Sequence, residues 1–261
     1  MKHLPKKQLG QNFLNSVGAL ELIIKEAELS KEDCVLEIGP GKGVLTEKLL
    51  LQTKMVVAVE KDRDLLPFLN EKFEKEIREK KLVLVEGDVR DIDIQNYLPQ
   101  KYKLVANIPY YLTGDLLKKT FSTTYPPKSM VLLLQKEVAQ RITDLKKSSI
   151  LAVSVWAYGE PKFVKTVKRG SFQPVPNVDS AILSIKNISK KSFEHFQVSE
   201  EKFFKVLKAG FAHKRKKLRK NLGEVFPDIN IENLLKNCEL SNDCRAEELN
   251  VNKWFCLSQK L

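Results

Sequence analysis

The chain has 261 residues, of which 43% are hydrophobic, and its net charge is +12 from 45 basic and 33 acidic side chains. This length suits one large domain or a large and a small one, and the hydrophobic content excludes wholesale disorder. So large a positive excess predicts a polyanionic partner, with nucleic acid the first expectation and an anionic membrane surface the second.

The N-terminal segment is polar and basic, without the apolar core of a secretory signal, and no apolar run is long enough to span a membrane. We therefore expect a cytoplasmic protein with no membrane association. The cysteines show no C-x-x-C spacing, so all four are expected to be reduced thiols. The three histidines are not spaced to complete a zinc site, and no metal is expected.

As far as about residue 135, short apolar runs alternate with amphipathic stretches. Continuous apolar strands separated by helices are typical of a buried parallel sheet with crossover connections. The expected strands lie at 34–38, 55–59, 82–85, 104–106 and 130–134, and the expected helices at 44–51 and 62–78.

The next part of the chain predicts the edge of the same sheet. Residues 163–167 and 178–185 are expected to be two further strands, in antiparallel orientation. Residues 148–157 alternate as in a strand, but their length also permits a helix.

Near residue 187 the strand-like runs disappear. Charged stretches with helical spacing occupy 200–222, 230–237 and 246–260. We therefore predict an α/β domain at 1–186, with an N-terminal arm, and a small all-helical domain at 187–261.

A glycine-rich loop, Gly39-Pro40-Gly41-Lys42-Gly43, follows the first expected strand and precedes a helix. Glycine lets the backbone turn tightly and lets a ligand approach closely. Dinucleotide-binding loops have the spacing G-x-G-x-x-G, whereas here Val44 stands where the last glycine would be. The loop therefore suits a cofactor without phosphate groups, with Gly39 and Gly41 as candidate contacts.

Polar residues also stand at the ends of the next three expected strands. Glu60 lies 21 residues after Gly39, where a carboxylate accepts hydrogen bonds from ribose hydroxyls. Asp88, followed by Val89, is placed to accept from an adenine amino group, and Asn107 ends the fourth strand. Because the carboxyl ends of parallel strands share one edge of a sheet, these residues are expected to line one crevice.

The segment Asn107-Ile108-Pro109-Tyr110 combines an amide, a rigid turn and an aromatic ring. The Asn107 side-chain oxygen and a nearby carbonyl can accept both N–H bonds of an exocyclic amine. Tyr110 offers a stacking face for a base removed from its helix. A nucleoside cofactor without phosphates beside a clamp for an amine predicts S-adenosylmethionine and methyl transfer.

A basic run without any acid covers 205–220, and apolar residues at helical spacing accompany it. Its density predicts phosphate binding, to which the N-terminal Lys2, Lys6 and Lys7 are expected to contribute. Adenines in single strands or loops are the expected targets, because the deep major groove of A-form RNA hides its bases. The candidate RNA-binding residues are Lys214, Arg215, Lys216, Lys217, Arg219 and Lys220.

Over nearly its whole length the chain resembles the small-subunit ribosomal RNA adenine dimethyltransferases. Ile108 and Tyr111 stand where relatives often have Leu and Asn. The motifs that carry the resemblance are Gln8 to Leu14, Val35 to Gly43, Asn107 to Tyr110, Phe172 to Ala181, Arg215 to Leu222 and Arg245 to Leu249.

The resemblance implies a Rossmann-like class I methyltransferase fold with a small C-terminal helical domain. It implies that Asn12 and Leu14 contact the cofactor from the N-terminal arm, together with the strand-end residues. It also implies that Tyr110 and Phe172 face the target base. The implied substrate is two adjacent adenines in a hairpin loop near the 3′ end of small-subunit (16S) rRNA, within an assembling subunit.

Rival interpretations remain at this point. An antibiotic-resistance methylase acting on large-subunit rRNA would share the cofactor site, although the glycine loop and residues 245–249 favour the small-subunit enzyme. A ribosome-assembly factor that acts mainly by binding is a second alternative; the intact segment 107–110 indicates that catalysis is retained, and the two roles can coexist. A DNA adenine methylase would need a sequence-reading domain, and a small-molecule methyltransferase would not explain the charge. A monomer is the default expectation.

Overall fold

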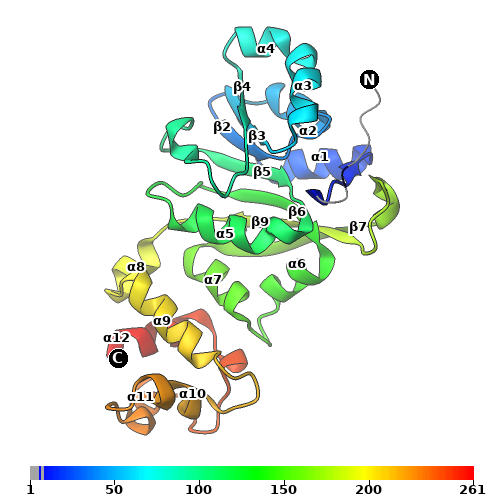
Figure 1. Ribbon diagram of the computed structural model, residues 1–261. Coiled ribbons are helices and arrows are strands. Elements are labelled where there is room, and N and C mark those ends of the chain that lie inside the picture. The colour runs from blue at the N-terminus through cyan, green and yellow to red at the C-terminus, as the bar shows by residue number, and fades with distance from the viewer. Residues whose placement is uncertain (1–5, 7–8) are drawn as a thin grey trace. The chain divides into compact units, whose positions relative to one another are not determined.

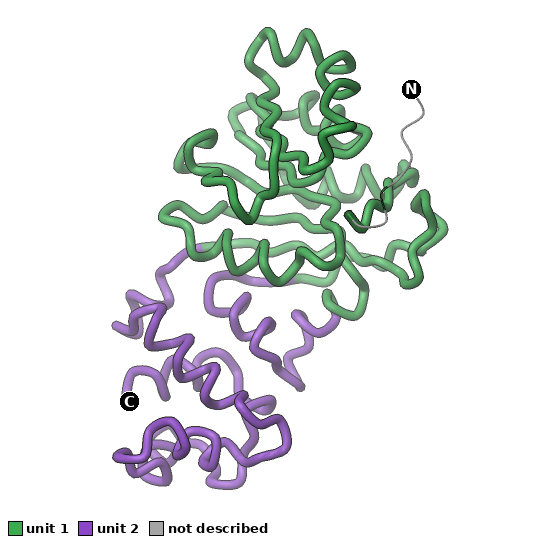
Figure 2. The backbone as a smooth tube through the Cα atoms, in the orientation of Figure 1, with its two compact units in different colours: residues 1–139, 162–188 green, residues 140–161, 189–261 purple. Residues whose placement is uncertain are grey.

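The computed structural model describes residue 6 and residues 9–261. The chain forms two compact units, Met1–Ala139 with Lys162–Ile188 (unit 1) and Gln140–Pro161 with Ser189–Leu261 (unit 2), as Figure 2 shows. Residues 140–161, included in the first predicted domain, thus group with the C-terminal helices. The assignment of separate roles to residues 1–186 and 187–261 stays a prediction. The phosphate contacts expected of Lys2 and Lys7 fall on residues outside the described part of the chain.

The central sheet of unit 1 has the strand order β4-β3-β2-β5-β6-β9-β7 (Figure 1). Pairing is parallel from β4 to β6, and β9 pairs antiparallel with β6. The predicted strands and the antiparallel edge are therefore confirmed. Their bounds are β2 Cys34–Ile38, β3 Met55–Glu60, β4 Leu82–Glu86, β5 Lys103–Asn107, β6 Met130–Gln135, β7 Glu160–Val167 and β9 Ser180–Lys186.

Helices cover the sheet in the pattern that its strand order dictates. The buried side chains of α1 (Val17–Glu26), α2 (Val44–Leu50) and α3 (Leu66–Lys72) share one core with residues of β2, β3, β5 and β6. The strand order reverses between β2 and β5, so right-handed crossovers place α5 (Thr113–Ser122) on the opposite face. Such a reversal opens a crevice at the carboxyl ends of the strands.

The stretch at 62–78, predicted as one helix, is divided into a 3₁₀ turn at Arg63–Leu65, then α3, then α4 (Glu74–Arg78). The break falls at Phe73, which has φ −116° and ψ 27°. Its ring packs against Gly43, where a Cβ would stand 2.5 Å from the ring and where φ is +70°. The packing of the buried Phe73 ring against Gly43 explains the break between α3 and α4, which the helical spacing of the sequence does not predict.

A second, two-stranded sheet ties the N-terminal arm to a distant loop. The strands β1 (Phe13–Leu14) and β8 (Phe172–Gln173) pair antiparallel, with Leu14 opposite Phe172. Asn15 N–H also donates to the Ser171 carbonyl at 2.8 Å. We call Lys6 together with residues 9–14 the N-terminal strap.

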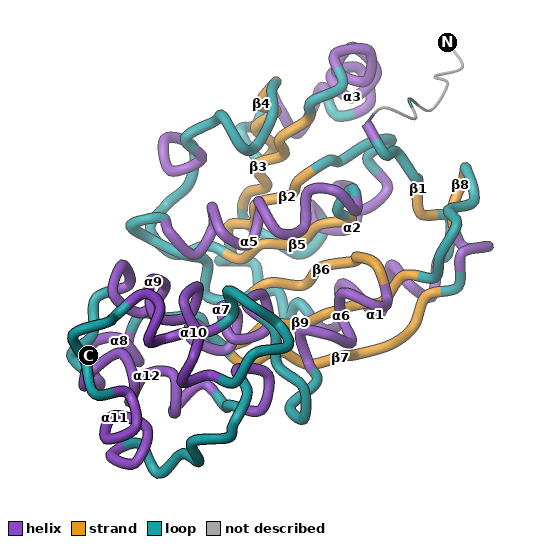
Figure 3. The backbone as a smooth tube through the Cα atoms, turned by 60° about the horizontal axis from the view of Figure 1, so that its bottom comes forward, coloured by secondary structure: helices purple, strands orange, loops and turns teal. Residues whose placement is uncertain are grey.

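Unit 2 is helical (Figure 3). The ambiguous stretch at 148–157 is helix α7 (Ile150–Tyr158), and the helix predicted at 200–222 is interrupted by turns at 211–217. No helix in the described part of the chain is long and apolar enough to cross a membrane. The other helices are α8 Lys191–Phe196, α9 Glu200–Gly210, α10 Leu218–Val225, α11 Ile231–Asn237 and α12 Val251–Lys260; α6 (Lys136–Thr143) begins in unit 1 and ends in unit 2.

Aromatic rings hold the core of unit 2 together. The ring of Phe255 in α12 lies 4.5 Å from that of Phe203 in α9 and 5.1 Å from that of Phe193 in α8, centroid to centroid. Phe203 is fully buried and Phe255 nearly so. Such pairs contribute directional packing beyond the area that they bury.

Cys238 and Cys256 form a disulfide, so the prediction of four reduced thiols is wrong for this pair. Cys34 and Cys244 are free. The two bonded cysteines are 18 residues apart in sequence, and the packing of α11 beside α12 brings their Cα atoms to 5.9 Å. The spacing of the cysteines in the sequence does not predict this disulfide.

Candidate functional site

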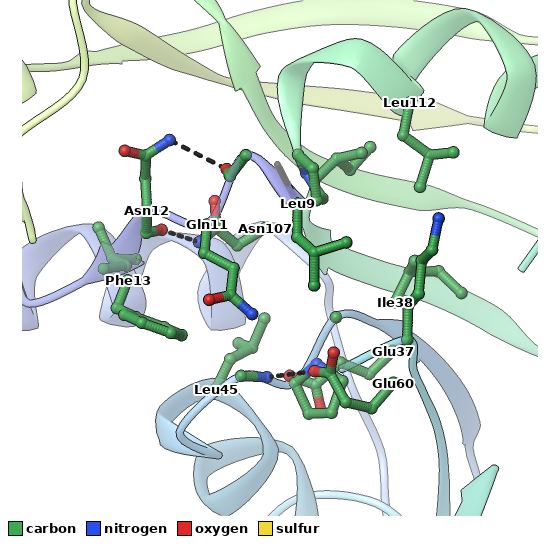
Figure 4. Close-up of a pocket in the computed structure, with 18 of the residues that line it drawn as sticks. Leu9, Gln11, Asn12, Phe13, Glu37, Ile38, Leu45, Glu60, Asn107 and Leu112 are labelled. Atoms are coloured by element: carbon green, nitrogen blue, oxygen red, sulfur yellow. Dashed lines mark hydrogen bonds between the residues drawn. The ribbon is translucent and has the colours of Figure 1, made fainter. Parts of the chain in front are cut away.

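A pocket in unit 1 lies at the carboxyl ends of β2, β3, β4 and β5 (Figure 4). It is lined by the strap, the glycine loop and the segments that follow these strands. The structure thus brings together every residue predicted for the cofactor and catalytic sets, although their individual roles stay predictions. These residues are Asn12, Leu14, Gly39, Gly41, Glu60, Asp88, Val89, Asn107, Tyr110 and Phe172.

The glycine loop is bound to the strand beside it. Gly39 N–H donates to the Val59 carbonyl at 2.9 Å, and Gly41 N–H donates to Glu60 Oε2 at 3.0 Å. Gly41 has φ +59°, and a Cβ there would lie 3.0 Å from the Phe13 ring of the strap. The loop therefore needs glycine both for its backbone angle and for the close approach of the strap.

Glu60 ends β3 and is only 5% exposed. Its two oxygens accept from the backbone N–H groups of Gly41, at 3.0 Å, and Asp62, at 2.8 Å. Burial raises the pKa of this carboxyl, and the backbone hydrogen bonds oppose that rise. The two backbone contacts fix the carboxylate in place, and each oxygen keeps a second lone pair for a ligand hydroxyl.

Asp88 follows β4 and is held by two cations. Arg90 donates from Nη2 at 2.6 Å and from Nε at 3.1 Å, and Lys61 Nζ lies 2.9 Å away. The hydrogen bonds from Arg90, followed by those from Lys61, keep the pKa of Asp88 well below its usual range despite partial burial. Asp88 is therefore an ionised acceptor at neutral pH.

Asn107, at the end of β5, has a fixed amide orientation. Its Nδ2 donates to the backbone carbonyl of Asn12 at 3.1 Å, and Asn12 Nδ2 donates to the Gly10 carbonyl at 3.1 Å (Figure 4). With Nδ2 committed to the strap, Oδ1 is the side of the amide that accepts hydrogen bonds in the pocket. The sequence predicted an acceptor here but not the group that orients it.

Aromatic rings form another part of the lining. The Tyr110 hydroxyl is 2.8 Å from Ser180 Oγ in β9, and burial raises the pKa of the phenol. Phe172 is 3% exposed and joins the core beneath the pocket, whereas Tyr111 is 49% exposed. The Arg90 guanidinium lies 5.9 Å from the centre of the Tyr111 ring.

The family model for ribosomal RNA adenine dimethylase matches residues 2–261 of this chain. The chain belongs to that family. Proteins named Ribosomal RNA small subunit methyltransferase A from Fusobacterium nucleatum and Dehalococcoides mccartyi are 37% and 40% identical to it. These alignments cover 98% and 97% of this chain, and 97% and 87% of the relatives.

Two solved structures share the fold across nearly the whole chain. The 23S rRNA methyltransferase ErmE is 25% identical with a TM-score of 0.77, covering 96% of this chain and 99% of its own. A dimethyladenosine transferase from Plasmodium falciparum is 27% identical with a TM-score of 0.77, covering 94% and 95%. The class I methyltransferase fold is thereby confirmed, and as a dimethylase family member the protein is a methyltransferase that uses S-adenosylmethionine.

The pocket fits that cofactor on the chemistry of its own groups. Glu60 offers a fixed carboxylate for ribose hydroxyls, and Asp88 offers an ionised one for an amino group. At Gly39, which also lines the pocket, a Cβ would meet no atom closer than the Asn107 carbonyl oxygen at 4.0 Å, so the loop leaves room for a ligand beside it. The described residues contain no group of three or more His, Cys, Asp or Glu side chains that could hold a metal.

In unit 2 the basic run is divided among α9, α10 and the turns between them rather than lying on one helix, which corrects the prediction of a basic helix. A groove beside these turns is lined by Lys214 and Lys216, by His213, and by Arg141, a cation that was not predicted. Lys216, Lys217 and Arg219 form ion pairs with Glu224, Asp243 and Glu232, at 2.6, 2.5 and 2.9 Å. Among the described residues, Lys214, Arg215 and Lys220 have no acid within ion-pairing distance.

Several charged residues of the site were not predicted from the sequence: Glu37 and Lys61, which line the pocket, and Asp62 and Arg90, which hydrogen-bond to Glu60 and Asp88. Each stands within two residues of a predicted position, and that proximity was the available signal. Glu37 is 1% exposed at the end of β2, and its Oε2 has no hydrogen-bond partner among the described residues. Burial, with a smaller effect from the charge of Glu60, raises the pKa of Glu37 to about 8.

This buried carboxyl predicts a specific pH dependence of stability. The folded protein keeps the Glu37 proton up to about pH 8, while the unfolded chain releases it near the usual value of 4.5. The free energy of unfolding therefore falls as pH rises through that window, by at most about 1.4 kcal/mol per unit from this group. Glu37→Gln should remove that part of the slope, as measured by urea unfolding from pH 5 to 8.5. Parallel curves for the two proteins would contradict the assignment.

Proposed function

We propose that the protein dimethylates N6 of two adjacent adenines in a hairpin loop near the 3′ end of small-subunit (16S) rRNA. The product would be N6,N6-dimethyladenosine, and the reaction would take part in small-subunit biogenesis. The observation that carries the proposal is the Asn107 amide, oriented by Asn12 in the same pocket as Glu60 and Asp88. The full-length relatives that bear the small-subunit methyltransferase name support this choice of substrate.

The chain's residues prepare the adenine amine as a nucleophile. Adenine N6 is a weak nucleophile because its lone pair is delocalised into the ring. Asn107 Oδ1 and the Ile108 carbonyl accept hydrogen bonds from the two N6–H groups. These hydrogen bonds favour a pyramidal nitrogen and expose that lone pair. S-adenosylmethionine, when bound, supplies the electrophilic methyl group. Orientation and electrostatics then account for most of the acceleration.

The aromatic residues would hold the target base. Tyr110, anchored through its hydroxyl to Ser180, presents its ring beside Asn107, and Phe172 backs the same pocket. A ring fixed at both ends loses little entropy when a base stacks on it. We assign Tyr110 and Phe172 to the positioning of the flipped adenine.

The basic turns of unit 2, together with the first turn of α10, would bind the rRNA backbone. Lys214, Arg215 and Lys220 carry charge that no described acid neutralises, so phosphate binding gains most from them. We further propose that the protein acts as a monomer in the cytoplasm, on an assembling subunit rather than on naked RNA.

The large-subunit alternative has the same fold, as the similarity to ErmE shows. The identity to ErmE is 25%, however, against 37% and 40% for the full-length small-subunit relatives. An assembly factor that acts mainly by binding would not need an oriented amide in a pocket with fixed carboxylates. Both alternatives are therefore less favoured.

The direct test is the transfer of labelled methyl groups from S-adenosylmethionine to under-methylated small subunits and, separately, to large-subunit particles. The proposal predicts N6,N6-dimethyladenosine at two adjacent adenines of the small subunit. Label confined to the large subunit would establish the resistance-type activity instead. Absence of label from both would leave a binding role.

Replacing Asn107 by Ala should lower turnover by about 100-fold or more, because the amine loses an acceptor aligned for the reaction. The side chain lies at a strand end and is partly exposed, so the melting temperature should change little. Asn70→Ala, at an exposed helical position of unit 1, is the matched control and should keep full turnover. Wild-type turnover in Asn107→Ala would refute the catalytic assignment.

Two triple variants separate the basic residues of unit 2. Replacing Lys214, Arg215 and Lys220 with Ala should weaken rRNA binding and reduce the salt slope by about 2. The matched triple at positions 216, 217 and 219 should have a smaller effect, since those cations already pair with acids. Binding titrations from 50 to 300 mM salt measure both slopes, and equal slopes for the first triple and the wild type would exclude those residues from the interface.

A further inference from the structure

The N-terminal strap is fastened to the end of β3 by a buried carboxylate. The Asp62 side chain has no exposed surface, and it accepts from Lys6 Nζ at 2.5 Å and from Gln11 Nε2 at 2.7 Å. Both donors belong to the strap and lie 56 and 51 residues away in sequence. A buried carboxylate with two long-range donors on one segment is an anchor for that segment.

The far end of the strap is fastened separately. Phe13 and Leu14 pair with Gln173 and Phe172, and Asn15 N–H bonds to the Ser171 carbonyl. Residues 9–12, which include the Gln11 attachment, line the pocket. The strap is therefore held at both ends, and the stretch between them faces the site.

The middle of the strap makes one contact with the proposed chemistry. The Asn12 carbonyl accepts Nδ2 of Asn107, which leaves Oδ1 for the substrate amine. Gly10, with φ +59°, packs beside the Tyr111 ring, where a Cβ would stand 3.4 Å from it. Displacing the strap would free the amide to rotate by 180° and present an NH₂ group, which cannot accept the adenine hydrogens.

We propose that Asp62 is a positioning residue: through Lys6 and Gln11 it holds the strap so that the Asn12 carbonyl sets the orientation of the Asn107 amide. The catalytic consequence rests on the proposed function, whereas the amide orientation does not. Asp62 N–H also donates to Glu60 Oε1 at 2.8 Å, so the same residue joins the anchor to the carboxylate assigned to ribose.

A purely structural role for Asp62 makes a different prediction. Asp62 also caps the 3₁₀ turn at 63–65 by accepting from Asp64 N–H at 3.2 Å, so its replacement removes a cap as well as an anchor. Gln11→Ala removes a strap donor and leaves the cap in place. Asp93 caps the 3₁₀ turn Ile94–Asn96 in the same way, without contacting the strap, and Asp93→Asn is the matched control.

The first experiment uses the protein without substrate, so its result does not depend on the proposed function. In ¹⁵N spectra, the side-chain NH₂ of Asn107, assigned by its loss in Asn107→Ala, reports its hydrogen bond to Asn12. We expect its hydrogen exchange to be slow in the wild type and Asp93→Asn, and at least 10-fold faster in Gln11→Ala and Asp62→Asn. Equal exchange in all four proteins would overturn the proposal.

The second experiment measures methyl transfer by the same variants. Gln11→Ala and Asp62→Asn should each lower kcat about 10-fold or more, and the double variant should fall no further than Asp62→Asn alone, because Asp62→Asn already weakens the contact that Gln11→Ala removes. Independent, multiplying losses, or a loss confined to Asp62→Asn with a lowered melting temperature, would assign Asp62 a structural role only. If the wild type methylates no rRNA, the proposed function is refuted. The hydrogen exchange of the Asn107 amide then still tests whether Asp62 anchors the strap.

Discussion

The carboxyl ends of neighbouring parallel strands must meet at one edge of their sheet, and the site depends on this constraint. The turns after β2, β3, β4 and β5 bring the glycine loop, Glu60, Asp88 and Asn107 within one pocket although they span residues 39 to 107. The reversal of strand order between β2 and β5 keeps helices away from that edge. The two-stranded pairing of β1 with β8 then adds the strap as the remaining wall.

Burial, neighbouring cations and backbone donors give the carboxylates around this edge different pKa values. Burial keeps Glu37 protonated to about pH 8, whereas two cations keep Asp88 ionised. Glu60 lies between these cases, with a raised pKa and backbone donors that favour its charged form. Of these acids at the ends of neighbouring strands, Glu37 is therefore neutral at neutral pH and Asp88 is charged.

Much of this arrangement was predictable because it follows from local pattern. Apolar runs set the strands, and the polar residue after each run falls at the strand end, so Glu60, Asp88 and Asn107 could be placed together. The remaining features depend on contacts between distant residues. Asn12 orients an amide 95 residues away, Phe73 breaks a helix by packing on Gly43, and Cys238 meets Cys256 through helix packing. Neither spacing nor periodicity encodes such contacts, since they arise only once the chain is folded.

The most direct test of the account is a crystal structure of the protein with S-adenosylhomocysteine, which marks the cofactor position without allowing transfer. The account predicts the ribose hydroxyls on Glu60, the adenine beside Asp88 and Val89, and the Asn107 Nδ2 still bonded to the Asn12 carbonyl. Ligand bound away from the ends of β2 to β5, or an Asn107 amide turned with Oδ1 toward the strap, would contradict it.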